Sequence, residues 1–346
     1  HEYIPISPSS EMANNLGGQA MKTLVVGGAG YIGSIVASEL VEAGHEVSVL
    51  DDLSRGTAQV EGTNFYEASL LDPESLDGVL ANGFDVVLHF AALALVPESV
   101  AEPELYFRVN VGGTLNLLEA MNAHDIKRIV FSSTCAVYGE PASVPITEQF
   151  PNNPTNSYGA SKLAVDHLLT AWTTARNSSA VSLRYFNVAG AAHGLGEHHE
   201  PETHIIPIVL DAAAGTRSHV EIFGTDYPTT DGTAVRDYIH VLDLATAHAA
   251  ALAHLRNEGG SLRCNLGTGR GCSVQEIISL AEAVTGKPVP LDYGPRRAGD
   301  PPSLVADPTL ARTALGWQAQ IPLSHGLQQA YADFQASLAS HSARSV

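Results

Sequence analysis

Residues 23–33 read TLVVGGAGYIG, a short apolar run followed directly by a glycine-rich turn. The apolar run predicts a buried strand, and the segment that follows, residues 32–43, predicts a helix. Gly27, Gly30 and Gly33 permit a tight turn, close approach of the backbone to a pyrophosphate and close packing of helix on strand. The helix start also offers N–H groups to phosphates. The segment therefore predicts a dinucleotide-binding α/β unit, with a purely structural glycine turn as the alternative.

A pair of carboxylates strengthens this interpretation. Asp51 and Asp52 end the second expected strand, about twenty residues after the turn, where an acidic side chain suits the two hydroxyls of a ribose. A carboxylate there would repel a 2′-phosphate, so the pair favours NAD over NADP.

From Met21 onward, short apolar runs alternate with helix-length amphipathic segments, the pattern of a parallel sheet covered by helices on both faces. The expected strands cover residues 23–26, 46–50, 65–67, 86–90, 128–132 and 181–184, and the expected helices cover 32–43, 102–122 and 160–175. The strands are mostly Val, Ile, Leu and Phe, as in strands buried on both faces. The expected fold class is α/β, a Rossmann-type doubly wound parallel sheet with a smaller mixed α/β lobe for the substrate.

The alternation of strand and helix patterns ends after about residue 187, where loops rich in Gly, His and Pro begin. We expect a first lobe at 21–187, a second lobe at 188–338, and a return of the chain to the first lobe as a strand and helix around 237–255. Residues 1–20 lack hydrophobic periodicity and are interpreted as a disordered leader or added expression sequence. Residues 339–346 are expected to be frayed.

Composition excludes several classes of partner. The 346 residues are 45% hydrophobic, and no apolar run approaches the ~20 residues that span a bilayer. A net charge of −19 argues against nucleic acid and anionic membranes as partners. Three cysteines, Cys135, Cys264 and Cys272, lack metal-ligand spacing and favour a reducing cytoplasm.

Tyr158 and Lys162 stand four residues apart where an expected helix begins, so they share one face of it. An ammonium beside a phenol favours the phenolate, which makes Tyr158 a candidate general base. Such a spacing is also common by chance. Thr134 follows the expected strand 128–132 at its carboxyl end, where open α/β sheets bind ligands. The alternative for Thr134 is a turn residue that bonds the local backbone.

The glycine-rich turn, Thr134 and the Tyr158/Lys162 pair together resemble the extended short-chain dehydrogenase/reductase family. Within it, the chain from about residue 21 to 338 is similar to the UDP-galactose (UDP-glucose) 4-epimerases. The most specific segments are LRYFN at 183–187, PETHIIP at 201–207, IFGTDYP at 222–228 and DGTAVRDYIH at 231–240.

The resemblance implies a role for each matching residue. Tyr158 is implied as acid and base at the sugar O4′, with Lys162 tuning it and holding the nicotinamide ribose, and Thr134 at the family's Ser/Thr position. The implied NAD-binding residues are Gly27, Gly30, Tyr31, Ile32, Gly33, Asp51, Asp52, Ser69, Leu70, Phe90, Ala91, Ala92, Asn110, Ser132, Tyr158, Lys162 and Phe186. The implied nucleotide-sugar residues are Thr134, Tyr158, Asn187, His204, Ile205, Phe223, Arg236, Arg297, Asp300 and Leu304.

The resemblance implies an isomerase that inverts C4′ of a UDP-hexose through a 4-keto sugar. NAD is regenerated in each cycle and stays bound to the enzyme. Arg236 and Arg297 also make chemical sense alone, because a diphosphate needs cationic forks. Their alternative is a pair of surface ion pairs with Asp237 and Asp300. The resemblance further implies a homodimer through the helices at 102–122 and 160–175.

Three positions depart from the family pattern. Ala94 stands where a lysine is frequent, so one cationic contact near the nicotinamide ribose or sugar is missing. Ser69 and Leu70 replace an Asp-hydrophobic pair at the adenine. Leu304 stands where some epimerases have a tyrosine that limits the sugar pocket, and a smaller residue there admits an N-acetylated sugar.

Other reactions of the family are separated by the residues after Thr134. Nucleotide-sugar 4,6-dehydratases have an Asp-Glu pair there and uronic acid decarboxylases have a glutamate, whereas this chain has Cys135 and Ala136 and so lacks those acid-base groups. UDP-glucuronate and UDP-N-acetylhexosamine 4-epimerases would keep the whole machinery and stay alternatives. From another class, an idle NAD-sensing scaffold is also an alternative. The presence of both Tyr158 and Lys162 argues against it.

Overall fold

The computed structural model describes residues 20–197, 202–297 and 300–344. Its centre is a seven-stranded sheet in the order β10-β6-β5-β4-β1-β2-β3, with every neighbouring pair parallel. The strands are β1 (Lys22–Val26), β2 (Glu46–Asp51), β3 (Asn64–Glu67), β4 (Val86–His89), β5 (Arg128–Thr134), β6 (Ser179–Tyr185) and β10 (Leu262–Leu266). The α/β fold class and the six expected strands are confirmed, and β10 is an additional edge strand.

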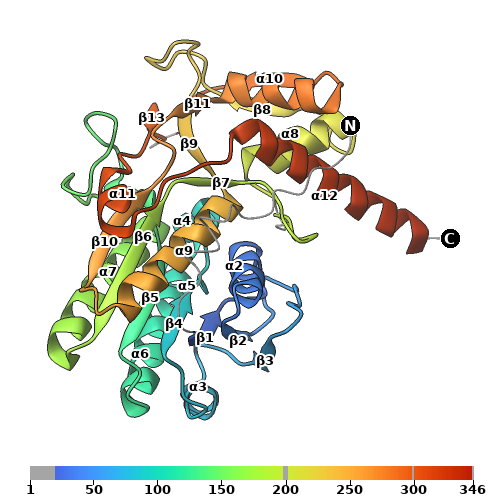
Figure 1. Ribbon diagram of the computed structural model, residues 1–346. Helices are drawn as coiled ribbons and strands as arrows, with labels where there is room; N and C mark the ends of the chain where they lie inside the picture. Colours follow the sequence, from blue (N-terminus) through green and yellow to red (C-terminus); the bar gives the residue numbers. More distant parts are fainter. Residues whose placement is uncertain (1–19, 198–201, 298–299, 345–346) are drawn as a thin grey trace.

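Helices cover both faces of this sheet, as Figure 1 shows. One face carries α2 (Tyr31–Glu42), α9 (Val241–Arg256) and α11 (Thr309–Leu315); the other carries α3 (Pro73–Leu80), α6 (Gly113–Ala123) and α7 (Ser157–Arg176). In β1, Val25 packs with Val36 of α2, whereas Leu24 and Val26 pack with Leu117 of α6 on the opposite face. Each such buried side chain stabilises the fold by about 1.5–3 kcal/mol, which is why these strands are apolar throughout.

The helix expected at 102–122 is a composite. It is preceded by α4 (Val96–Ala101) and consists of α5 (Pro103–Tyr106), a π-helical turn at Phe107–Gly112 and then α6. Glu102 has φ −127° and ψ 61°, so the helical run starts at Pro103, where the missing N–H of proline costs nothing. The wider π turn contains Asn110, a buried polar residue that faces the site described below.

The smaller lobe lies above the large sheet in Figure 1. It contains a four-stranded mixed sheet of β7 (Asn187–Ala189), β9 (Val235–His240), β11 (Gly271–Ser273) and β13 (Ser303–Leu304). A second sheet pairs β8 (Val220–Phe223) with β12 (Leu291–Gly294), and the helices are α8 (Ile205–Ala214), α10 (Val274–Thr285) and α12 (Leu323–Arg344). The expected smaller mixed lobe is therefore present.

Two details of chain organisation differ from expectation. Of the segment 237–255, α9 packs on the large sheet, but β9 joins the smaller sheet because it pairs with β7, β11 and β13. Helix α12 continues to Arg344 and so includes most of the segment 339–346 that was expected to be frayed. Residues 1–19, which hold almost all of the expected leader, lie outside the described residues, as does Pro201. Among the described helices, none has the length and apolar character needed to cross a membrane.

Candidate active site

The glycine-rich turn between β1 and α2 is shaped by close backbone contacts. Gly27 has φ +83°, and a Cβ atom there would lie 2.4 Å from the main-chain nitrogen of Ala91. A Cβ atom on Gly33 would lie 2.2 Å from the carbonyl oxygen of Gly27. Gly30 caps α2 without a side-chain hydrogen bond, so the first N–H groups of this helix are available to an anion. The turn thus has the form that fits a dinucleotide pyrophosphate.

Asp51 and Asp52 lie at the end of β2 beside this turn. Asp51 accepts hydrogen bonds from the main-chain nitrogens of Ala29 at 3.0 Å and Leu53 at 2.9 Å. Burial raises the pKa of Asp51 above its usual value, against these two bonds. Ser69, which replaces the usual aspartate, donates to Asp52 at 3.2 Å. The acidic rim fits a ribose diol and opposes a 2′-phosphate, as expected for NAD.

The segment after β4 joins the turn to α7. The main-chain nitrogens of Phe90 and Ala91 both donate to the carbonyl oxygen of Val26, at 2.8 and 3.0 Å. The buried Asn110 accepts from the main-chain nitrogen of Leu93 at 2.8 Å and donates to Ser161 at 3.0 Å. Asn110 therefore fixes the position of the 90–93 segment relative to the helix that carries Tyr158.

Tyr158 and Lys162 are both presented by α7, which begins at Ser157 after the N-cap Asn156. The Lys162 ammonium donates to the carbonyl oxygen of Ser132 at 2.9 Å and lies 4.8 Å from the centre of the Phe131 ring. Burial lowers the pKa of Lys162 to about 7, while the charge of Asp166 acts in the opposite direction.

The Tyr158 phenol lies near Thr134. Burial raises the pKa of Tyr158 above its usual value, and the neighbouring Thr134 side chain opposes this rise. The Lys162 ammonium is directed to β5, and the expectation that Lys162 lowers the pKa of Tyr158 stays a prediction. Thr134 also accepts from the main-chain nitrogen of Ala136 at 3.1 Å, so its local role and its contact with Tyr158 coexist.

The two arginines expected in the second lobe make different contacts. Arg236 of β9 forms an ion pair with Asp300 and donates to the carbonyl oxygen of Val235 at 2.7 Å. The Arg297 guanidinium lies 3.8 Å from the centre of the Phe223 ring. Asp237 is buried and accepts from Thr268 and Gly269, so the ion-pair alternative holds only for Arg236 with Asp300.

Apolar residues connect the two lobes near Thr134. Leu304 on β13 lies opposite Arg236 in the strand register. It packs in one cluster with Cys135, which follows Thr134, and with Phe186, which precedes Asn187 at the start of β7. The predicted catalytic and sugar-pocket residues are therefore neighbours.

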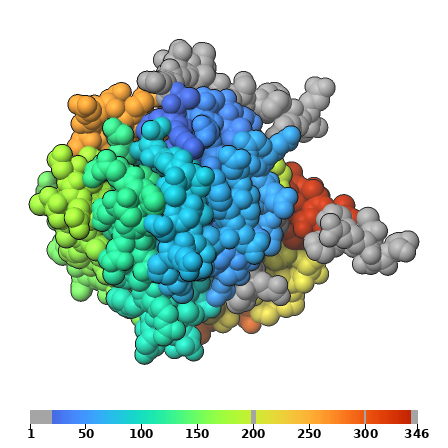
Figure 2. Space-filling view, turned by 90° about the horizontal axis from the view of Figure 1, so that it is seen from below, coloured from blue at the N-terminus to red at the C-terminus, as the bar shows by residue number. Residues whose placement is uncertain are grey.

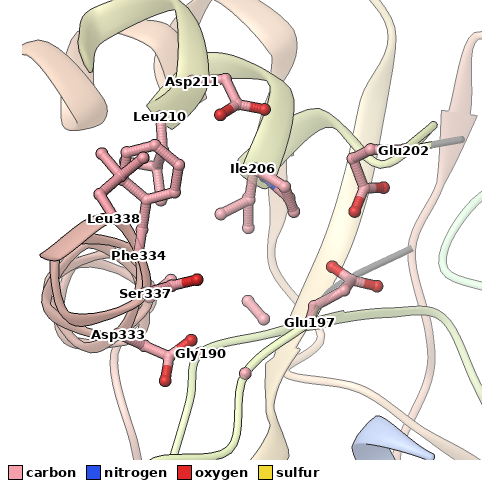
Figure 3. A pocket seen from close by; sticks show the side chains of 14 residues that line it. Gly190, Glu197, Glu202, Ile206, Leu210, Asp211, Asp333, Phe334, Ser337 and Leu338 are labelled. Atoms are coloured by element: carbon pink, nitrogen blue, oxygen red, sulfur yellow. The ribbon is translucent and has the colours of Figure 1, made fainter. Parts of the chain in front are cut away.

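His204 and Ile205 begin α8 beside a separate cavity. The His204 Nδ1 lies 3.1 Å from a Glu197 oxygen and 3.2 Å from a Glu202 oxygen. Burial alone would lower the pKa of His204, but these carboxylates outweigh it and raise the pKa. Glu197, Glu202 and Asp333 line a cavity of about 180 Å³ (Figure 3), whereas Tyr158, Lys162 and Thr134 do not. The cavity borders Gly190, whose carbonyl oxygen accepts from Tyr31 at 2.5 Å.

Residues 23–267 match the model of the NAD dependent epimerase/dehydratase family. The chain belongs to this family. It is 52% identical over 300 residues to the UDP-glucose 4-epimerase of Streptomyces lividans, covering 86% of this chain and 91% of that protein. It resembles the crystal structure of UDP-glucose 4-epimerase from Brucella ovis in complex with NAD, with 46% identity and a TM-score of 0.88 over 90% of this chain and 98% of that one. It also resembles the enzyme from Bifidobacterium longum in complex with NAD⁺ and UDP, with 38% identity and a TM-score of 0.86 over 91% and 98%.

Within this epimerase/dehydratase fold, sequence reasoning missed residues that support the centre. The Tyr185 hydroxyl is hydrogen-bonded to Ser132, and burial raises its pKa to about 12. Asp166 of α7 and Arg184 of β6 form a fully buried ion pair at 2.7 Å. The available signals were the LRYFN segment, which contains Arg184 and Tyr185, and the position of Asp166 four residues after Lys162.

Proposed function

We propose that this protein is an NAD-dependent isomerase that interconverts UDP-glucose and UDP-galactose by inversion at C4′. The observation that carries this proposal is that α7 presents Tyr158 and the buried Lys162 one helical turn apart, and that Lys162 donates to the carbonyl oxygen of Ser132 near the carboxyl end of β5. An open α/β sheet places its reacting ligands there. The names of the relatives and the family of the chain support the same reaction.

In this mechanism, Tyr158 takes the proton of the sugar O4′ and later returns it, while Thr134 holds the reacting oxygens in place. Lys162, fixed by Ser132, supplies the positive charge that favours the phenolate. NAD, held at the glycine-rich turn, would supply a reversible hydride acceptor for C4′ of the sugar. The 4-keto sugar turns over between loss and return of this hydride, so the site has to hold the nucleotide firmly and the sugar loosely.

The NAD-binding residues belong to the first lobe, for which we propose the bounds 21–187. Gly27, Gly30 and Gly33, with Tyr31 and Ile32 at the start of α2, take the pyrophosphate. The remaining proposed contacts are Asp51, Asp52, Ser69, Leu70, Phe90, Ala91, Ala92, Asn110, Ser132 and Phe186.

The UDP part is assigned to the second lobe, for which we propose residues 188–338. Arg236 and Arg297 are the cationic forks for the diphosphate, and the half-buried ring of Phe223 offers a face for the base. Arg236 is paired with Asp300, and the Arg297 guanidinium lies over the Phe223 ring. We expect the phosphates of UDP to compete with these two contacts. Asn187, His204 and Ile205 complete the proposed set.

The identity of the sugar depends on its C2 and C6 substituents. Leu304 packs beside Cys135 and Phe186, and its apolar side chain is smaller than a tyrosine. This favours N-acetylated sugars as further substrates. Ala94 removes one cationic contact, so UDP-glucuronate is the weaker second candidate.

Assembly as a homodimer is also proposed. Four apolar side chains, Val96, Val100, Phe107 and Leu115, are exposed on α4, the π turn and α6, and Val100 is 64% exposed. Figure 2 shows this lobe from below, where the chain from β1 to α6 (blue to teal) covers most of the surface. Light scattering of the wild-type protein and of Val100→Glu tests this. The wild-type protein is expected to be a dimer, and Val100→Glu is expected to be a monomer. The free cysteines of the structure support a cytoplasmic location.

The decisive assay for the reaction compares substrates. Purified protein is incubated separately with UDP-glucose, UDP-N-acetylglucosamine and UDP-glucuronate, and the C4′ epimers are quantified by chromatography. UDP-galactose formation without added cofactor is expected. Absence of product from all three sugars would favour the idle NAD-binding scaffold.

A further inference from the structure

Three consecutive residues of β5 each contact one residue of α7. Thr134 lies near Tyr158, the carbonyl oxygen of Ser132 accepts from Lys162 at 2.9 Å, and the Ser133 hydroxyl lies 3.5 Å from Asp166. Tyr158, Lys162 and Asp166 follow one another at four-residue intervals and so lie on one face of the helix. Lys162 is 3% exposed and Asp166 is 1% exposed.

Asp166 uses one of its two oxygens for its ion pairs. The Oδ2 atom accepts from the Arg184 Nε at 3.1 Å and Nη2 at 2.7 Å, and it lies 3.5 Å from the Arg263 Nε. The Oδ1 atom is buried and has no hydrogen-bond partner among the described residues. A buried acceptor without a partner is costly, so the carboxylate is not explained fully by its bonds to arginine.

We propose that Asp166 is a positioning residue that keeps the buried Lys162 charged beside Tyr158. Residues four apart on a helix have Cβ atoms about 5–6 Å apart, close enough for a carboxylate to stabilise an ammonium in the protein interior. This inference rests on the proposed function, in which the charge of Lys162 assists Tyr158.

The balance of charge around Lys162 explains why the carboxylate is needed. Arg184 cannot lose its proton, so it remains cationic at 0% exposure. Without Asp166, Lys162 would share the interior with an uncompensated guanidinium, and the ammonium would be the group that gives up its proton. Burial already lowers the pKa of Lys162 to about 7, and Asp166 is the charge that opposes this effect.

Other titratable and charged groups surround this position. On the elements packed against α7 and on the adjoining strands they are His89, Glu98, Glu104, Tyr106, Arg108, Glu119, Arg128, Cys135, Tyr138, Arg184, Tyr185, Arg263 and Cys264. His89 stays neutral, because burial lowers its pKa to about 3, and burial keeps Tyr185 and Cys135 protonated by raising each pKa to about 12. Glu98 is bonded to Arg55 and Tyr106.

The test measures the Lys162 titration directly, by NMR of protein labelled with ¹⁵N and ¹³C at lysine. The chain has four lysines, Lys22, Lys127, Lys162 and Lys287, so the Lys162 signal is assigned as the one lost in Lys162→Arg. Asp166→Asn is expected to lower the Lys162 midpoint by about one pH unit or more. Arg184→Met is expected to raise it, since it removes a cation. Asp166→Glu keeps the charge and is expected to stay near the wild-type midpoint.

Asp166→Asn and Arg184→Met break the same ion pair, so both should lower the melting temperature. Only the positioning role predicts that they shift the Lys162 midpoint in opposite directions. An unmoved Lys162 midpoint in Asp166→Asn would overturn the inference. If Asp166→Asn does not fold, the test uses Arg263→Met, because the Arg263 side chain is 35% exposed and its replacement should disturb the interior less. It should raise the midpoint by roughly 0.3 pH unit, and no rise counts against the inference.

Activity provides a second readout. The alkaline limb of the turnover profile should move to lower pH in Asp166→Asn and to higher pH in Arg184→Met, parallel to the NMR midpoints. Shifted midpoints in a protein inactive on every UDP-sugar would leave the Asp166–Lys162 coupling intact and refute the proposed function. Unshifted midpoints in an active enzyme would refute the Asp166–Lys162 coupling and leave the proposed function intact.

Discussion

The Lys162 ammonium donates to the carbonyl oxygen of Ser132 at 2.9 Å, and β5 thereby fixes the lysine that stands one helical turn after Tyr158. Thr134, two residues further along the same strand, lies near the Tyr158 phenol. A rigid strand in the sheet interior, rather than a loop, therefore sets the positions of both groups. Such support is what precise proton transfer requires.

Tyr158→Phe removes the proton-transfer group and little contact area. Turnover of UDP-glucose should fall at least about a hundredfold, while the dissociation constant for UDP, measured by calorimetry, should stay within about twofold of wild type. Tyr293→Phe, at a side chain that is 61% exposed, is the control and should keep full activity. Near-normal turnover in Tyr158→Phe would exclude this tyrosine as the acid and base.

Gly27→Ala tests the glycine-rich turn. Both Gly27 and Gly44 have positive φ, +83° and +85°, but a Cβ at Gly27 would lie 2.4 Å from Ala91, whereas at Gly44 nothing lies within 4 Å. Gly44→Ala should cost about 1 kcal/mol of backbone strain and keep its NAD. Gly27→Ala should lose NAD, measured by mass spectrometry of the purified protein. Equal NAD content in the two variants would contradict the assigned role of the turn.

The free energy of unfolding should depend on pH through the titration of His248. Its pKa is lowered by burial to about 4, against the hydrogen bond to the Leu244 carbonyl. Between pH 6.5 and 4 the unfolded chain binds more protons at this residue, so its contribution to stability is present above pH 6.5 and is lost as the pH falls. From pH 7.5 to pH 5 the loss is about 2 kcal/mol.

Urea unfolding of His248→Gln checks this. The variant should lose about 2 kcal/mol less than wild type between pH 7.5 and pH 5, because the other histidines titrate alike in both proteins. Parallel pH curves would show that His248 is not held neutral by the fold.

Leu304→Tyr tests the sugar pocket. A tyrosine fills space next to Cys135 and Phe186 that we assign to a C2 N-acetyl group. The kcat/KM for UDP-N-acetylglucosamine should fall by about tenfold or more, and that for UDP-glucose should change by less than about threefold. Equal losses on both sugars would mean that Leu304 does not select the C2 substituent.

Local patterns predicted the large sheet well, because strands buried on both faces must be apolar and the turn at Gly27–Gly33 has few conformational solutions. They did not predict β10, which pairs with β6 through residues 81 positions apart in sequence, or the placement of β9 in the smaller sheet. The i, i+4 rule placed Tyr158 and Lys162 on one face but gave no direction for the ammonium. That direction depends on Ser132, a partner supplied by tertiary packing.

The central claim is inversion at C4′ by removal and return of the same hydrogen. The most direct measurement is conversion of UDP-glucose carrying deuterium at C4′ by the purified protein, without added cofactor and in ordinary water, followed by mass spectrometry. The account predicts UDP-galactose that retains the deuterium at C4′. Absence of UDP-galactose, or UDP-galactose with the deuterium exchanged into water, would contradict it.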